Sequence, residues 1–426
     1  MGLFMATVLV LVNMVGTGIF LLPVSMASVG SISILGWVVA AVGAAAIGLM
    51  FAILGSVKPE AGGPYAYARD SLGPYLGFQT NYIYWSANLI GNIAVATTVT
   101  GYLSDLVPFL QGTLNQTLTT IAIIWVATAV NIAGPRWVGF FTGWGTVIAM
   151  VPLILIAVAG WFWFRPEIFL SSWNPHGDSS WDAISTSAAF ALWAFMGVES
   201  ASVASDVIEN PKRNIPLATM IGLAIATVLY VSTCTVLMGI IPANELAASS
   251  APFAIAAAKA VGPVGGVIIA LCAVLKAGSS LVGWTLTICQ SAQAAGKDGL
   301  FPSIFGRLDS RGIATPNLLI TGLLMTGVVL VTISPSLSKQ FSEIIDMAII
   351  LTILPYMYSG VALLKICQGQ GRALWHHYLL VAIVGIVSIY CLWVVAGSQA
   401  DLARNAMIIL FASVPLYPFF ASRMEK

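Results

Sequence analysis

Long apolar segments separated by short polar stretches dominate the chain. A membrane-spanning helix needs about 20 consecutive, mostly apolar residues. The pattern therefore predicts an all-α integral membrane protein with twelve transmembrane helices, and an Ala-rich amphipathic stretch at 251–262 predicts a further helix at the membrane surface. The predicted spans are approximately 4–28, 31–56, 76–104, 116–134, 142–164, 184–206, 213–241, 264–292, 316–336, 342–366, 375–397 and 402–421.

Two glycines interrupt the first predicted span in the sequence Gly16-Thr17-Gly18. Each Gly costs about 1 kcal/mol relative to Ala inside a helix. Irregular backbone at membrane depth is tolerated only where it is buried in protein or lines a wet cavity. We therefore expect a broken helix whose free backbone groups bind a ligand, as in secondary transporters. The alternative is a small-residue packing seam between helices.

The sixth predicted span contains a second interruption, with Gly197 and Glu199 at mid-depth. Corresponding interruptions in two halves of a chain point to an inverted repeat with a binding site between them. A carboxylate at this depth is costly unless it is partnered, protonated or reached by water. Glu199 is therefore expected to act as a proton-responsive switch, and the alternative is an acid tied to local N–H groups.

Composition supports a membrane protein, because only 8% of the residues are charged whereas 59% are hydrophobic. A soluble globular domain carries about 25% charged residues. The net charge of +1 gives no electrostatic basis for nucleic-acid binding. The five cysteines have no metal-ligand spacing, and the three histidines lie in predicted loops or at a segment end. We therefore expect neither an enzyme nor a cofactor.

The distribution of Lys and Arg predicts the orientation, because cytoplasmic loops carry an excess of both. If the N-terminus is cytoplasmic, the inner side holds twelve of these residues and the outer side four, so both termini are predicted inside. The inner set is Lys58, Arg69, Arg136, Lys212, Arg213, Lys297, Arg307, Arg311, Lys365, Arg372, Arg423 and Lys426. The outer set is Arg165, Lys259, Lys339 and Arg404.

Aromatic and amide side chains near the interruptions are candidates for substrate binding. Trp193 lies beside the second interruption, and Trp284 follows a stretch of small residues in the eighth span. Indole faces attract cations, most strongly in desolvated sites. Tyr84, Asn88 and Asn92 are spaced four residues apart, so they share one helix face. Each of these residues could instead belong to the packed core or join helices.

Two further charged residues, Asp346 and Lys276, lie inside predicted spans. Asp346 could face an ammonium group on the substrate, and Lys276 could replace a bound sodium ion with a fixed cation. The alternative is that the two residues pair with each other or lie near a wet mouth.

Several segments resemble the basic amino acid/polyamine antiporters of the amino acid–polyamine–organocation superfamily, and the resemblance runs over essentially the whole chain. Segments two and three look most like the arginine/agmatine exchangers, other loops look more like the putrescine/ornithine exchangers, and the lysine/cadaverine exchangers are a third relative. The motifs that carry the resemblance are VNMVGTGIFLLP, GGPYAYARDSLGPYLGFQTN, IGNIAVA, LWAFMGVESASVASDVIENPKRNIPLAT and GWTLTICQ.

The resemblance implies a five-plus-five inverted repeat with broken helices 1 and 6, followed by two extra helices. The transport core would cover 1–366, with repeats at about 1–164 and 184–366, and 367–426 would hold the extra helices and a cytoplasmic C-terminus. It also implies a homodimer in the lipid of a bacterial inner membrane. The implied function is exchange of a cationic amino acid for its decarboxylated amine, such as arginine for agmatine or ornithine for putrescine. A proton- or sodium-coupled symporter is the alternative.

The resemblance also implies roles for individual residues. Trp193 matches a Trp that stacks on the cationic head of the substrate, Trp284 an outer gating Trp, and Asn92 an Asn near a guanidinium. Asn88 and Val95 depart from the arginine/agmatine exchangers, which have Cys and Met there, so the substrate pair stays open. The residues matching the first-helix binding site are Asn13, Thr17, Gly18 and Ile19, and those matching an inner gate are Tyr84, Glu199 and Tyr356.

Overall fold

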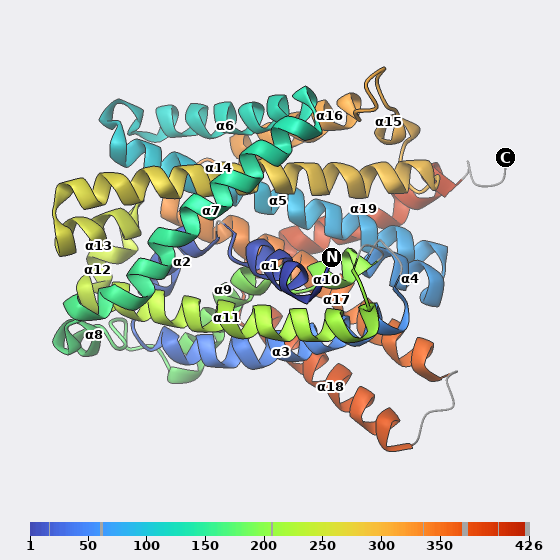
Figure 1. Cartoon of the computed structure of the whole chain (residues 1–426), viewed down its shortest axis with the longest axis horizontal. Helices are drawn as coiled ribbons and strands as arrows, with labels where there is room; N and C mark the ends of the chain where they lie inside the picture. The colour runs from blue at the N-terminus through green and yellow to red at the C-terminus, as the bar shows by residue number, and fades with distance from the viewer. Residues whose placement is uncertain are drawn as a thin grey trace.

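The structure is a computed structural model that describes residues 1–16, 18–59, 63–205, 208–334, 336–368, 374–398 and 400–421. Every regular element in that part of the chain is a helix, so the predicted all-α class is confirmed there. Figure 1 shows most of the long helices running along the longest axis of the molecule, with α1 and α10 near its middle.

The longer helices coincide with the predicted apolar segments. They are α1 (Leu3–Met14), α2 (Gly18–Val29), α3 (Ser33–Val57), α5 (Pro74–Leu106), α6 (Thr113–Ala133), α7 (Pro135–Ala159), α9 (Ser180–Phe195), α11 (Pro211–Ile240), α14 (Pro263–Lys297), α16 (Thr315–Val331), α17 (Leu337–Gln368), α18 (Leu374–Ala396) and α19 (Ala400–Ala421). The short helices are α4 (Pro64–Leu72), η1 (Pro108–Leu110), η2 (Gly160–Trp163), α8 (Pro166–Ser171), α10 (Ser200–Val203), α12 (Ala243–Ala247), α13 (Pro252–Val261) and α15 (Ser303–Gly306).

Seven of the described helices are long and apolar enough to cross a membrane, and the count rises to eight if the bent pair α1–α2 forms one span. The chain is therefore a multi-pass membrane protein, while the full count of twelve remains a prediction. Some predicted spans do not meet these criteria of length and hydropathy, and the reasons are physical. Buried polar side chains lower the hydropathy of α5, and α9 has only 16 residues because it ends at Phe195.

The start of α7 differs from the prediction. The apolar pattern placed this span at 142–164, but the helix begins at Pro135. Gly134 adopts a φ of +114°, which breaks the chain direction after α6, and Pro135 then occupies the first helical position. Pro is favoured there because its missing N–H has no helical partner to lose. Hydropathy missed this turn because Arg136 interrupts the apolar run.

The helix α5 forms the centre of the packing. It has 33 residues, most of which are buried, and its main neighbours are α14 and α17. Its buried polar residues include Gln79, Asn88 and Asn92, which a membrane-facing helix would not retain. The fold therefore surrounds α5 with other helices and makes its polar face available to an internal site.

Candidate functional site

The two interruptions predicted from the sequence meet in the middle of the molecule. The helices α1 and α2 are bent by 51° around the first break, and the chain between Phe195 and Ser200 leaves the helical path at the second. Gly197 has a φ of +98°, and a Cβ added there would lie only 3.1 Å from the Asn13 carbonyl oxygen. Asn13 Nδ2 also donates to Ser200 Oγ at 2.9 Å. The backbones of the two breaks therefore touch.

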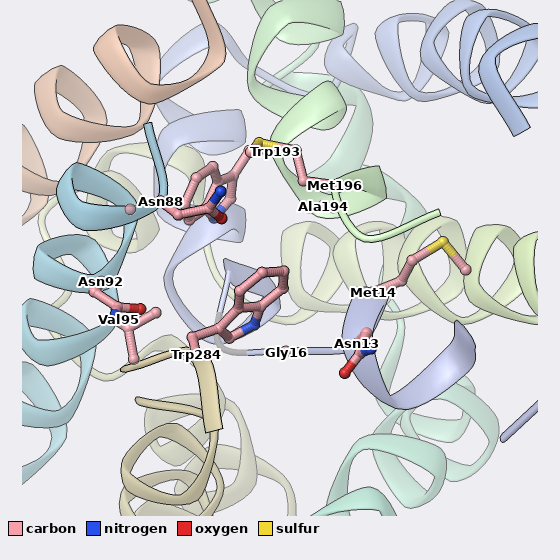
Figure 2. A pocket seen from close by; sticks show the side chains of 11 residues that line it. Asn13, Met14, Gly16, Asn88, Asn92, Val95, Trp193, Ala194, Met196 and Trp284 are labelled. Carbon is pink, nitrogen blue, oxygen red and sulfur yellow. The ribbon is translucent and has the colours of Figure 1, made fainter. Parts of the chain in front are cut away.

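A cavity opens beside this junction. Figure 2 shows Asn88, Asn92 and Val95 along α5 on one side and Asn13 and Met14 on the other, with the Trp284 ring between them. Among the described lining residues none is charged, so recognition of a cation would rest on amide oxygens and indole rings. The lining residues are Asn13, Met14, Gly16, Asn88, Gly91, Asn92, Val95, Trp193, Ala194, Met196 and Trp284.

The Trp193 ring lies directly against α5 at Gly91. A Cβ added to Gly91 would lie 2.5 Å from Trp193 Cη2, which is closer than van der Waals contact allows. Glycine is therefore required for the indole to reach this position. Trp193 is partly exposed and lines the cavity.

The two α5 amides of Asn88 and Asn92 line the cavity and bind other groups of the protein. Asn88 Nδ2 donates to the Tyr84 carbonyl oxygen at 2.7 Å, and Asn92 Nδ2 donates to Thr285 Oγ1 at 3.2 Å. If the Asn88 amide were reversed, its oxygen would face the Tyr84 carbonyl oxygen, and two acceptors would be in contact. The hydrogen bond to Tyr84 therefore fixes the orientation of the Asn88 amide. The Asn88 amide oxygen is therefore left as an acceptor, whereas Asn92 can offer either its oxygen or its NH₂ group, because the Thr285 hydroxyl can both donate and accept.

Glu199 lies at the second break and is hydrogen-bonded to α5 and α17. The Tyr84 hydroxyl on α5 donates to Glu199 Oε1 at 3.1 Å, and the Tyr356 hydroxyl on α17 donates to Oε2 at 3.0 Å. The Gly197 N–H also donates to Oε2 at 3.1 Å. The carboxyl is 2% exposed. We call Glu199, Tyr84 and Tyr356 the predicted inner gate, or inner gate for short, after the role that the family resemblance implies for them; their hydrogen bonds link α5, α17 and the second break.

The remaining predicted site residues lie outside the described lining of this cavity. Thr17 falls outside the described residues, Gly18 begins α2, and Ile19 is buried in its first turn. Lys276 is buried on α14 at 1% exposure. Asp346 is buried on α17 at 5% exposure, and within the described part of the chain it forms no hydrogen bond or ion pair. The structure thus gathers five of the predicted binding residues at the cavity: Asn13, Asn88, Asn92, Trp193 and Trp284.

Sequence reasoning missed several residues that build the site. Ser200 and Thr285 bond Asn13 and Asn92, and Met14 and Met196 complete the apolar lining. Single hydroxyl and Met residues are common in membrane helices, so nothing in the pattern distinguishes these four. Gly91 carried a usable signal, because a Gly between two buried amides on one helix suggests a close approach by another side chain.

Comparison with known proteins gives a consistent result. A family model described as amino acid permease matches residues 1–414. The chain is 36% identical over 430 residues to the cadaverine/lysine antiporter of Escherichia coli (strain K12), an alignment covering 100% of this chain and 95% of the relative. It is also 36% identical over 432 residues to the putrescine transporter PotE of the same strain, covering 100% and 97%. The putrescine transporter PotE of Haemophilus influenzae is likewise 36% identical over 430 residues, covering 100% and 98%.

Proposed function

The chain belongs to the amino acid permease family, and we propose that it is an antiporter exchanging a cationic amino acid for its decarboxylated amine by alternating access. The observation that carries this proposal is the central cavity. It lies where two helix breaks meet, and it combines two indoles with amide oxygens above a buried inner gate. The relatives at 36% identity are named for cadaverine, lysine and putrescine.

The substrate carboxylate would bind at the first break. A helix N-terminus attracts anions through its free N–H groups and its dipole. The N-terminus of α2, at Gly18 and Ile19, supplies such groups, and the Thr17 hydroxyl would add a donor. The α-ammonium would bind backbone carbonyl groups at the second break. A decarboxylated amine lacks the first contact, so the site must tolerate its absence.

The distal end of the substrate would lie between Trp193 and the two amides of α5. This position suits a compact primary ammonium, because an amide oxygen can accept its hydrogen bonds and the Trp193 indole can lie beside it. A guanidinium is planar and binds best to a carboxylate fork, which the described lining lacks. We therefore propose lysine or ornithine, with cadaverine or putrescine, ahead of arginine and agmatine.

The position in the cell follows from the same proposal. The excess of basic residues in the loops predicted inside favours cytoplasmic termini. A bacterial inner membrane fits the family and the bacterial relatives. The helices α18 and α19 expose many large apolar side chains, including Ile389, Leu392 and Phe411, and a homodimer would bury some of them.

Exchange in liposomes tests the function. Purified protein is reconstituted into vesicles loaded with unlabelled lysine, ornithine, arginine, cadaverine, putrescine or agmatine, and uptake of labelled amine is followed. We expect lysine or ornithine inside to drive uptake and empty vesicles to take up almost none. Equal uptake into empty vesicles would contradict exchange, and a strict sodium requirement would favour the symporter instead.

A further inference from the structure

Gln79 joins three helices through one buried side chain. It lies on α5 at 6% exposure. Its Nε2 donates to Ser413 Oγ on α19 at 2.9 Å, and its Oε1 accepts from the Tyr358 hydroxyl on α17 at 2.6 Å. Both ends of the amide are therefore used, and each binds a different neighbouring helix.

The contact with α19 is unusual for that helix, because most of α19 faces away from the protein. Ser413 is 0% exposed, whereas Val414 and Phe411 beside it are 50% and 60% exposed. The rings of Tyr75 and Tyr417 meet edge to face at 5.0 Å next to the same contact. A narrow buried stripe therefore fixes α19 to the inner end of α5.

The contact with α17 lies just beyond a proline. Pro355 lacks an N–H, so α17 loses one backbone hydrogen bond there and bends more readily. Tyr356 of the inner gate follows directly, and Tyr358 lies two residues further on. The direction of the part of α17 that follows Pro355 therefore depends on its contacts with neighbouring helices. Gln79 supplies one of them through its short hydrogen bond with Tyr358.

We infer that Gln79 is a positioning residue of the inner gate, holding α17 beyond Pro355 against α5 and α19 so that the Tyr356 hydroxyl reaches Glu199. This inference rests on the proposed function, since the gate must re-form in every transport cycle. Gln79 is absent from the described lining of the substrate cavity. Its loss should therefore slow switching between states and leave substrate binding intact.

The test compares Gln79→Leu, Tyr358→Phe and Ser413→Ala with the wild type in full-length protein. Initial exchange rates at saturating cadaverine are measured in liposomes, and cadaverine binding is measured by calorimetry in detergent. The loss of one hydrogen bond should shift the equilibrium of the gate by about five-fold. Each variant should therefore lower the maximal exchange rate about five-fold, while its affinity for cadaverine stays within about two-fold of the wild type. Ser413→Thr keeps the hydroxyl and should restore the rate. Gln340→Leu, a buried Gln in the outer half of α17, is the matched control.

Folded Gln79→Leu protein exchanging at the wild-type rate would overturn the inference. A loss of rate that comes with equal losses of affinity and melting temperature would also overturn it, because that pattern indicates only general destabilisation. A wild type that binds cadaverine without exchanging it would contradict the proposed function instead, so the two failures are distinguishable.

Discussion

At the scale of single residues, the shape of the cavity depends on where small residues let larger side chains approach. The indole of Trp193 reaches the cavity because Gly91 leaves room for it. Two different substitutions should therefore damage the same subsite. Trp193→Leu removes the aromatic face, and Gly91→Ala leaves the face intact but displaces it.

We expect Trp193→Leu to weaken substrate binding by about 1–2 kcal/mol, the range for a cation–π contact in a desolvated site. Trp193→Phe should retain part of the affinity, because a smaller ring still faces the ammonium. Gly91→Ala should weaken binding in the same direction. Calorimetry with purified protein measures all three, and unchanged affinity in folded Trp193→Leu would place this residue in the packed core.

Asp346 is a buried acid that lies outside the described lining of the cavity. It lies on α17 without a described hydrogen bond or ion pair. A carboxylate within about 4–6 Å of an ammonium stabilises the charged form of both. We expect Asp346→Asn to weaken binding of diamines and ornithine more than that of arginine, with competition binding as the measurement. An equal effect on all substrates, or a loss of protein yield alone, would mean that Asp346 serves the fold rather than the substrate.

The sequence predicted five residues that the structure places at one cavity, but not their hydrogen-bond partners. Asn13, Asn88, Asn92, Trp193 and Trp284 stand out because polar or bulky groups beside breaks are rare at membrane depth. The oxygen-outward orientation of Asn88 was not predictable, because it depends on one backbone carbonyl in the folded helix. Whether a side chain such as Asp346 reaches a cavity depends on helix rotation, which spacing alone does not define.

At the scale of elements, apolar segments predicted helix positions because the bilayer demands continuous hydrogen-bonded spans. Helix ends were less predictable. The true start of α7 depends on the turn at Gly134 and Pro135, which hydropathy does not detect. The break before Ser200 was predictable, since Gly and an acid together disfavour a continuous membrane helix.

The helix α14 brings Lys276 towards the first break. Ser280, one turn further along the same face, lies 4.0 Å from a Cβ placed on Gly16. A fixed ammonium here could take the place of a bound sodium ion. We therefore expect exchange to be unchanged when choline replaces sodium, and Lys276→Ala to reduce turnover more than binding. Exchange that stops without sodium would contradict this role.

The loop between α15 and α16 depends on Asp309. The Ile313 N–H and the Arg311 side chain donate to its carboxylate and hold the pKa of Asp309 well below its usual range. A depressed pKa means that the ionised acid stabilises the fold above its unfolded pKa of about 3.9. This contribution is lost as the pH falls below that value towards the folded pKa.

We therefore expect Asp309→Asn to lower the melting temperature by a constant amount between about pH 5 and pH 8, where the wild-type acid is fully ionised. The difference should shrink below about pH 4, because the unfolded wild type then binds a proton that the folded protein does not. Thermal melts across this range are the measurement. A difference that grows on acidification would contradict the assigned role.

At the scale of the whole molecule, α5 and α17 connect the cavity to the gate. The helix α5 carries the two amides above and Tyr84 below, and α17 contributes Tyr356. The contact between the two breaks joins residues 187 positions apart. Corresponding interruptions in two halves of the chain pointed to a site between them, but they did not predict which side chains touch.

Glu199 is where these long-range contacts converge, so it should govern switching rather than binding. It is absent from the described lining of the cavity, yet it accepts hydrogen bonds from α5, α17 and the second break. We therefore expect a substrate to bind without it and the predicted inner gate to fail to close. We expect Glu199→Ala to nearly abolish exchange of every substrate while binding stays detectable.

Paired measurements on one preparation separate these two effects. Calorimetry reports binding and loaded liposomes report exchange, with Glu245→Ala as a control because this exposed acid pairs only with Lys259 among the described residues. A surface pair of this kind contributes about 0–1 kcal/mol, so the control should exchange normally. If Glu199→Ala lost affinity and exchange in parallel, the carboxylate would belong to the substrate site, and the gate would have to be assigned to other residues.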